Sequence, residues 1–105
     1  MDNKNLEVIM GLIVHGGNAK SHAMEAIQLA KAQQFDEADK KIVLAKESLV
    51  EAHHTQTGLL TAEASGRNTE ISLLMVHSQD HLMTAIAFTD LAEEIIAIYK
   101  KIAQN

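Results

Sequence analysis

The 105-residue chain contains no cysteine and no proline. Without cysteine it can form no disulfide, no thiolate metal site and no cysteine nucleophile, and such a composition suits a reducing compartment. Without proline, and with only five glycines, helices can run long without interruption. Aromatic residues make up 3% of the chain, so each helix buries little surface on its own. A small domain of this kind often needs a partner subunit to complete its core.

Clustered positive charge and long apolar runs are also missing. The net charge is −5, and the nine Lys and Arg residues form no dense cluster, which argues against a nucleic-acid partner bound through its phosphates. No apolar run approaches the roughly 18 residues of a membrane span. The first five residues, Met1-Asp2-Asn3-Lys4-Asn5, lack the basic and then apolar layout of a signal peptide. We therefore expect a cytoplasmic protein with no direct insertion into a membrane.

Helical periodicity runs along nearly the whole chain, and strand signals are absent. The pattern breaks at two places. Asp36 is a plausible N-cap after the first break, and Gly66 fits the left-handed position that ends a helix, with Asn68 or Thr69 able to cap the next one. Short links between long helices make neighbours antiparallel. The sequence predicts one all-α domain over residues 1–105, an antiparallel up-down-up three-helix bundle with helices at about 3–32, 36–65 and 69–103.

Two predicted helices carry a recognisable apolar seam. The seam of the second helix has coiled-coil spacing, and Gln56 is its one polar member. In the first helix, the adjacent Gly16 and Gly17 lie in mid-helix, where glycine costs up to about 1 kcal/mol relative to alanine. Close backbone approach to a neighbouring helix explains them better than a direct functional role. The second seam comprises Ala38, Ile42, Ala45, Leu49, Ala52, Gln56 and Leu59, and the first Leu6, Ile9, Ile13, Gly16, Ala23, Ile27 and Ala30.

The third helix is apolar on more than one side, which a three-helix monomer cannot cover. We therefore predict oligomerisation through this helix, on the side that we call the second stripe. The first face comprises Leu74, Ser78, His81, Ala85, Phe88, Ala92 and Ile95. The second stripe comprises Leu73, Val76, Asp80, Thr84, Ala87, Leu91, Ile98 and Ile102, and a third side carries Met75, Leu82 and Ile86.

Asp80 is the one carboxylate within the second stripe. A carboxylate buried there without a partner would be costly, so it would be protonated, paired or bound to a metal. In a symmetric assembly, copies of Asp80 meet at the axis, and a divalent cation with oxygen ligands relieves their repulsion. Alternatively, Asp80 sits at a wet rim of the interface. The pattern does not favour either interpretation.

His77 and His81 are one helical turn apart on the same side of the third helix. They could chelate zinc together with Asp80, although Asp80 points partly away. They could be core histidines with satisfied hydrogen bonds. One of them could also be a nucleophile, because neutral imidazole attacks phosphorus well and a neighbouring histidine or amide can orient the ring. The spacing alone does not distinguish among these three interpretations.

The run from Ser72 to Ile86, Ser-Leu-Leu-Met-Val-His-Ser-Gln-Asp-His-Leu-Met-Thr-Ala-Ile, closely resembles the signature of a known family. This is the lactose/cellobiose-type IIA component of the bacterial sugar phosphotransferase system. The resemblance spans essentially the whole chain in order. It extends to Leu12, Ile13, Gly17, Ala19 and Ser21, and to Ala52, His53, Gln56, Thr57, Leu59, Leu60, Glu63, Ala64 and Gly66.

The resemblance implies a homotrimer of three-helix subunits in which His77 accepts phosphate from the phosphocarrier HPr. The phosphate then passes to the IIB component during uptake of a β-linked disaccharide of the cellobiose, chitobiose or lactose type through the IIC membrane permease. It also implies that Asp80 from each subunit binds an axial metal, with magnesium as the usual ion. Gln79 and His81 match positions lining the site.

Two functions of different classes thus compete. One is a phosphotransferase component with a phosphohistidine intermediate. The other is a non-enzymatic, metal-binding helical module for oligomerisation or interaction, in which the histidines only pack or bind metal.

Overall fold

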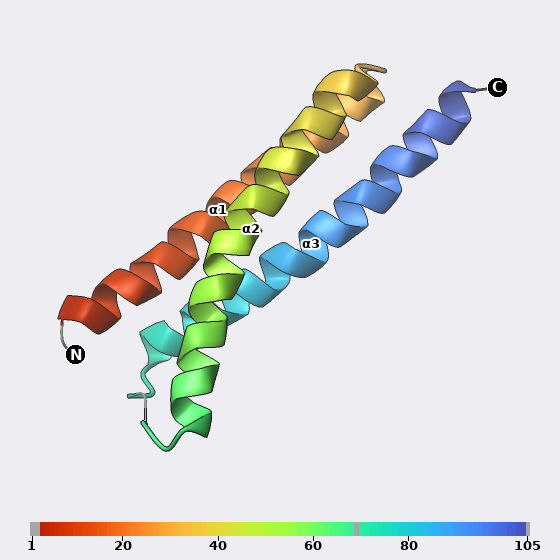
Figure 1. The fold of residues 1–105 in the computed structure, drawn as a ribbon. Coiled ribbons are helices and arrows are strands. Elements are labelled where there is room, and N and C mark those ends of the chain that lie inside the picture. The colour runs from red at the N-terminus through yellow and green to blue at the C-terminus, as the bar shows by residue number, and fades with distance from the viewer. Residues whose placement is uncertain (1–2, 69, 105) are drawn as a thin grey trace.

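The computed structural model describes residues 3–68 and 70–104, and these form three helices without any strand. Helix α1 spans Asn3–Lys31, α2 spans Phe35–Ala64 and α3 spans Leu73–Ala103. The chain runs up along α1, down along α2 and up again along α3 (Figure 1), in a bundle with extents of 56 × 22 × 19 Å. The predicted all-α, up-down-up architecture is confirmed. None of the helices in the described ranges is both long and apolar enough to cross a membrane.

The turn between α1 and α2 is built on a glutamine in the left-handed conformation. Gln33 has φ 63°, and its N–H donates to Ala30 O at 3.0 Å while the Gln34 N–H donates to Leu29 O at 2.9 Å. These two bonds form a Schellman motif, which satisfies the last carbonyls of α1. The sequence gives no sign of it, because glycine is the residue that usually occupies this position.

The predicted cap at Asp36 is wrong. Gln34 occupies the N-cap of α2, without a side-chain hydrogen bond, and Asp36 lies inside the first turn. The Schellman motif sets this start, because it brings the chain into α2 directly after Gln34. Asp36 and Glu37 still stabilise the helix, since negative charge is favourable near a helix N-terminus.

The turn after α2 follows the prediction at Gly66. This glycine has φ 89° and donates to Glu63 O at 3.0 Å, and the Arg67 N–H donates to Ala62 O at 3.0 Å. Together they make a second Schellman motif, with glycine in the left-handed position.

Helix α3 begins later than predicted. Its N-cap is Ser72, whose extended backbone lets the side chain accept a hydrogen bond of 3.1 Å from the Met75 N–H. Asn68 does not cap α3, and Thr69 lies outside the described residues. Several capping residue types precede this helix, and the cap bond to Met75 selects Ser72 among them.

Small residues dominate the core and let the helices approach closely. Ala19, Ala23, Ala26 and Ala30 of α1 are all buried, with Ala38 and Ala45 of α2 against them. Helix α1 packs against both other helices, whereas α2 and α3 touch each other much less. The seam predicted for α2 is confirmed, because Ala38, Ile42, Ala45, Ala52 and Gln56 are buried and Leu49 and Leu59 are half-buried.

The buried face of α3 lies between two of its predicted sides. Ser78, Ala85 and Ala92 are buried as expected, but Leu74 and Ile95 of the first face are exposed and Phe88 is half-buried. Contact with both α1 and α2 turns the core face toward the third side, which adds Met75 and Leu82. The full buried set is Met75, Ser78, Leu82, Ala85, Thr89, Ala92 and Ile96.

The second stripe is exposed along its whole length in the isolated subunit. Val76 is 52% exposed, Leu91 62% and Ile98 58%. A continuous apolar stripe of this length is more typical of an interface than of a solvated surface.

Within the described part of the chain, three ion pairs join neighbouring helices, and all lie in the half of the bundle away from His77. Lys41 Nζ of α2 lies 2.9 Å from Glu25 Oε2 of α1. The hydrogen bond from Lys41 and its positive charge lower the pKa of the Glu25 carboxyl. The pair therefore contributes at neutral pH, and its contribution is lost as the pH falls through the lowered pKa. The others are Lys46–Glu93 at 3.0 Å and Lys100–Asp39 at 2.9 Å.

The two Schellman turns make opposite predictions for stability. Gln33→Gly should raise the free energy of unfolding by about 1 kcal/mol, because a left-handed non-glycine residue is strained. Gly66→Ala should lower it by about 1 kcal/mol, and only through the backbone, since nothing lies within 4 Å of a Cβ built there. Urea unfolding at one fixed protein concentration measures both. A less stable Gln33→Gly protein would contradict the strain at Gln33.

Candidate functional site

The structure brings His77 and His81 together on α3. Their rings stack with centroids 5.9 Å apart and an interplanar angle of 24°. His77 is exposed and His81 is half-buried. Of the two, His77 is therefore the ring that a partner protein can reach.

The glycine pair of α1 makes room for His81. A Cβ built on Gly16 would lie 3.0 Å from His81 Cδ2, and one on Gly17 would lie 3.6 Å from His81 Nε2. The predicted close approach to a neighbouring helix is confirmed, and the group it accommodates is a side chain of the site. The His81 ring is held between the backbone of α1 and the ring of His77.

Gln79 lies on the other flank of α3. Two residues along an α-helix turn the side chain by about 200°, so Gln79 points away from His77. Its Oε1 accepts a hydrogen bond of 2.7 Å from Nε2 of Gln56 on α2. Within one chain, the structure therefore does not bring Gln79 to the two histidines.

Asp80 is an exposed member of the second stripe. Its backbone carbonyl accepts a hydrogen bond of 2.7 Å from Thr84 Oγ1, but no described side chain bonds or pairs with its carboxylate. Among residues 3–68 and 70–104, no three His, Asp or Glu side chains come together as a metal site. The zinc site considered for His77, His81 and Asp80 is thus not formed within one chain.

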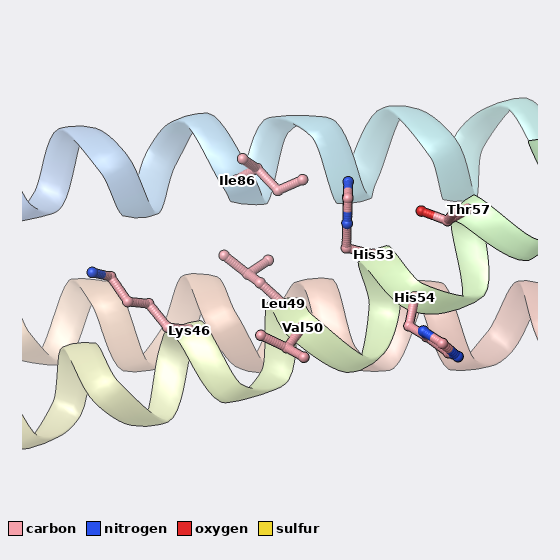
Figure 2. A pocket seen from close by; sticks show the side chains of 7 residues that line it. All are labelled: Lys46, Leu49, Val50, His53, His54, Thr57 and Ile86. Atoms are coloured by element: carbon pink, nitrogen blue, oxygen red, sulfur yellow. The ribbon is translucent and has the colours of Figure 1, made fainter.

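A groove with a volume of about 590 Å³ lies between α2 and α3 (Figure 2), and no pattern in the sequence indicates it. The ring of His53 points from α2 toward α3 in this view, whereas His54 points away from α3 (Figure 2). The groove lies on the same flank of α3 as Gln79, opposite to the histidine pair. It is lined by Lys46, Leu49, Val50, His53, His54, Thr57 and Ile86.

Residues 7–100 match the protein family described as PTS system, Lactose/Cellobiose specific IIA subunit. Among curated proteins, the chain is 50% identical over 105 residues to the lichenan-specific phosphotransferase enzyme IIA component of Bacillus subtilis (strain 168). That alignment covers 100% of this chain and 96% of the relative.

Solved structures agree with these sequence matches. The crystal structure of the PTS cellobiose-specific enzyme IIA from Bacillus anthracis superposes with a TM-score of 0.96 at 48% identity, covering 100% of this chain and 96% of that chain. The IIA(chitobiose) in a solution structure of its complex with HPr superposes with a TM-score of 0.81 at 36% identity. There the coverage is 92% of this chain and 94% of that chain.

Two glycines of α1 provide a matched test of the contact with His81. Gly11→Ala should raise the free energy of unfolding by up to about 1 kcal/mol, because nothing lies within 4 Å of its Cβ. Gly16→Ala should gain less, because its Cβ forces the His81 ring to shift by a few tenths of an ångström. Urea unfolding gives the stabilities, and NMR of the ring carbons should show shifts at His77 and His81 for Gly16→Ala alone. Equal spectra for the two variants would show that Gly16 does not hold His81 in place.

Proposed function

The chain belongs to the lactose/cellobiose-specific IIA family of the sugar phosphotransferase system and is a phosphoryl carrier of that system, and we propose that it carries the phosphoryl group on His77. The family membership decides between the two functions that the sequence left open. The chain is a phosphotransferase component that accepts phosphate from HPr, rather than a non-enzymatic helical module.

The exposure of His77 is the observation that carries this assignment. A ring nitrogen of the neutral imidazole attacks phosphorus as the bond from phosphorus to the donor breaks, and the same step in reverse releases the group to the next acceptor. Such a transfer depends on positioning and on stabilising charge on the phosphoryl oxygens. An acceptor at the surface suits a carrier that must meet two different proteins in turn.

His81 supports His77 in this proposal and does not itself accept phosphate. Its ring is held against Gly16 and Gly17 on one side and His77 on the other, which limits the approach of a donor. An N–H of this ring can donate to a phosphoryl oxygen on the neighbouring ring, and such charge-assisted hydrogen bonds are the strong ones.

We further propose that three subunits assemble around the second stripe. The stripe carries exposed apolar side chains over most of the length of α3, and burying them provides the driving force. In a cyclic trimer, one flank of each subunit meets the opposite flank of its neighbour. The flank with His77 then faces the flank with Gln79, so that the Gln79 amide approaches the phosphoryl group of the adjacent subunit.

The Asp80 carboxylates meet at the axis of such a trimer. Each chain supplies one Asp80 carboxylate that pairs with no described side chain, and carboxylate oxygens suit a divalent cation shared by three copies, for which we choose magnesium. The bound ion would neutralise part of the charge of the three carboxylates. Asp80 thus serves assembly, and it takes no part in phosphoryl transfer.

The phosphoryl group passes from His77 to the IIB component and, through it, to a β-linked disaccharide of the cellobiose, chitobiose or lactose type entering by the IIC permease. We place these steps in the cytoplasm, in keeping with a chain that contains no cysteine.

The first test separates the two histidines. His77→Ala should abolish labelling by phospho-HPr, because it removes the nucleophile, while His81→Ala should keep part of the labelling. Intact mass after incubation with phosphoenolpyruvate, enzyme I and HPr measures both, and circular dichroism checks that each variant is still helical. Full labelling of His77→Ala, or no labelling of the wild type, would overturn the assignment.

The second test concerns assembly. Asp80→Lys should dissociate the trimer, because three positive charges without a counter-ion would meet at the axis. Asp36→Lys makes the same charge change in the exposed first turn of α2 and should leave the trimer intact. Sedimentation with and without a chelator measures both, and Asp80→Ala should lose its response to the chelator. A trimeric Asp80→Lys protein would show that Asp80 lies away from the axis.

A further inference from the structure

Gln56 is a buried amide in an otherwise apolar seam. It is 9% exposed, and the other members of the α2 seam are alanine, isoleucine and leucine. Burying an amide costs free energy unless it is hydrogen-bonded, and an apolar side chain of the same size would pack here without that cost. The residue therefore needs an explanation beyond core packing.

The bond that Gln56 makes has a definite polarity. Its Nε2 donates to Oε1 of Gln79 at 2.7 Å and also approaches Met83 Sδ at 3.6 Å. The carbonyl oxygen of Gln79 thereby faces Gln56. Among the residues that the structure describes, its own Nε2 has only Met75 Sδ as an acceptor, at 3.7 Å, and a thioether is a weak acceptor.

A glutamine amide can turn over and exchange its oxygen with its nitrogen. In one orientation Gln79 presents N–H donors outward, and in the other it presents a carbonyl oxygen. A phosphoryl group carries negative charge on its oxygens, so it is stabilised by the first orientation and repelled by the second. In the structure, Gln56 Nε2 donates to Gln79 Oε1 and also approaches Met83 Sδ, and this pairing corresponds to the first orientation.

We propose that Gln56 is a positioning residue for phosphoryl transfer, which fixes the Gln79 amide with its N–H groups directed at the phosphoryl group. This inference rests on the proposed function, in which Gln79 faces His77 of the adjacent subunit. Gln56 touches no reacting atom, and it acts from α2 through Gln79 on α3.

Two substitutions of similar size separate positioning from packing. Gln56→Glu replaces the donor by a carboxylate that only accepts, so the Gln79 amide turns over and offers its oxygen to the phosphoryl group. Gln56→Met removes the amide but keeps the shape, which leaves Gln79 free to adopt either orientation. A packing role predicts that only stability changes, whereas a positioning role predicts that transfer follows the polarity of residue 56.

The readout is the equilibrium constant for phosphoryl exchange between HPr and each variant, measured by intact mass at about pH 8, where a glutamate is ionised. We expect a loss of about tenfold or more for Gln56→Glu and a smaller loss for Gln56→Met. The Gln56→Glu defect should shrink as the pH is lowered, because a protonated carboxyl again donates to Gln79. Thermal unfolding and sedimentation of both variants establish that the folded assembly is being compared.

Equal exchange constants for the two variants, or a Gln56→Glu defect that does not change with pH, would overturn the inference. Two further variants distinguish this outcome from failure of the proposed function. His77→Ala tests the phosphoryl acceptor itself, and Gln79→Met tests the role of Gln79. If Gln79→Met exchanges phosphate like the wild type, the role proposed for Gln79 is wrong. If Gln79→Met is impaired while Gln56→Glu behaves like the wild type, only the role of Gln56 is wrong.

Discussion

The second stripe of α3 is the constraint on which the other features of this protein depend. Its side chains lie on the side of α3 away from the core, so neither α1 nor α2 of the same subunit can cover it. A helix with apolar residues on several sides leaves part of its apolar surface exposed in an isolated three-helix subunit. This imbalance is the reason for our proposal that subunits assemble around the stripe. It also explains why no side chain in residues 3–68 and 70–104 of the same subunit pairs with the carboxylate of Asp80, which lies within the stripe.

The same geometry divides α3 into two functional flanks. His77 and His81 lie on the side toward α1, and Gln79 lies on the side toward α2. Each flank is fixed by its neighbouring helix in a different way. The glycine pair of α1 leaves space for an imidazole, while an amide of α2 supplies a hydrogen bond. The two helices that form the core with α3 thus also set the positions of His81, which stacks on His77, and of Gln79, which we propose faces His77 of the adjacent subunit.

The sequence predicts well the features that depend on local pattern. The α2 seam is predictable because its members recur every three or four residues. The end of α2 is predictable because its left-handed turn favours a glycine, which is Gly66. The left-handed turn at Gln33 is not predictable, since glutamine is a common residue in helices and does not indicate a positive φ. The sequence does not fix the start of α3, because several residues that can cap a helix precede it, and only the hydrogen bond from the Met75 N–H identifies Ser72 as the N-cap. The pairing of Gln56 with Gln79 spans two helices, and the only signal for it was a polar residue in an apolar seam.

A reversible carrier imposes opposing demands, and the two flanks of α3 can meet both. The acceptor must be open, because two different proteins approach it in turn, so no lid of the same chain can stabilise the phosphoryl group. The groups that stabilise the phosphoryl group must therefore be side chains held in a fixed orientation beside the acceptor. Such an orientation requires contacts with buried residues, because a fully exposed glutamine or histidine side chain samples several rotamers and hydrogen-bonds with water. In our proposal, Gly16 next to His81 and Gln56 next to Gln79 have this role, and each lies on a neighbouring helix rather than in front of the exposed His77.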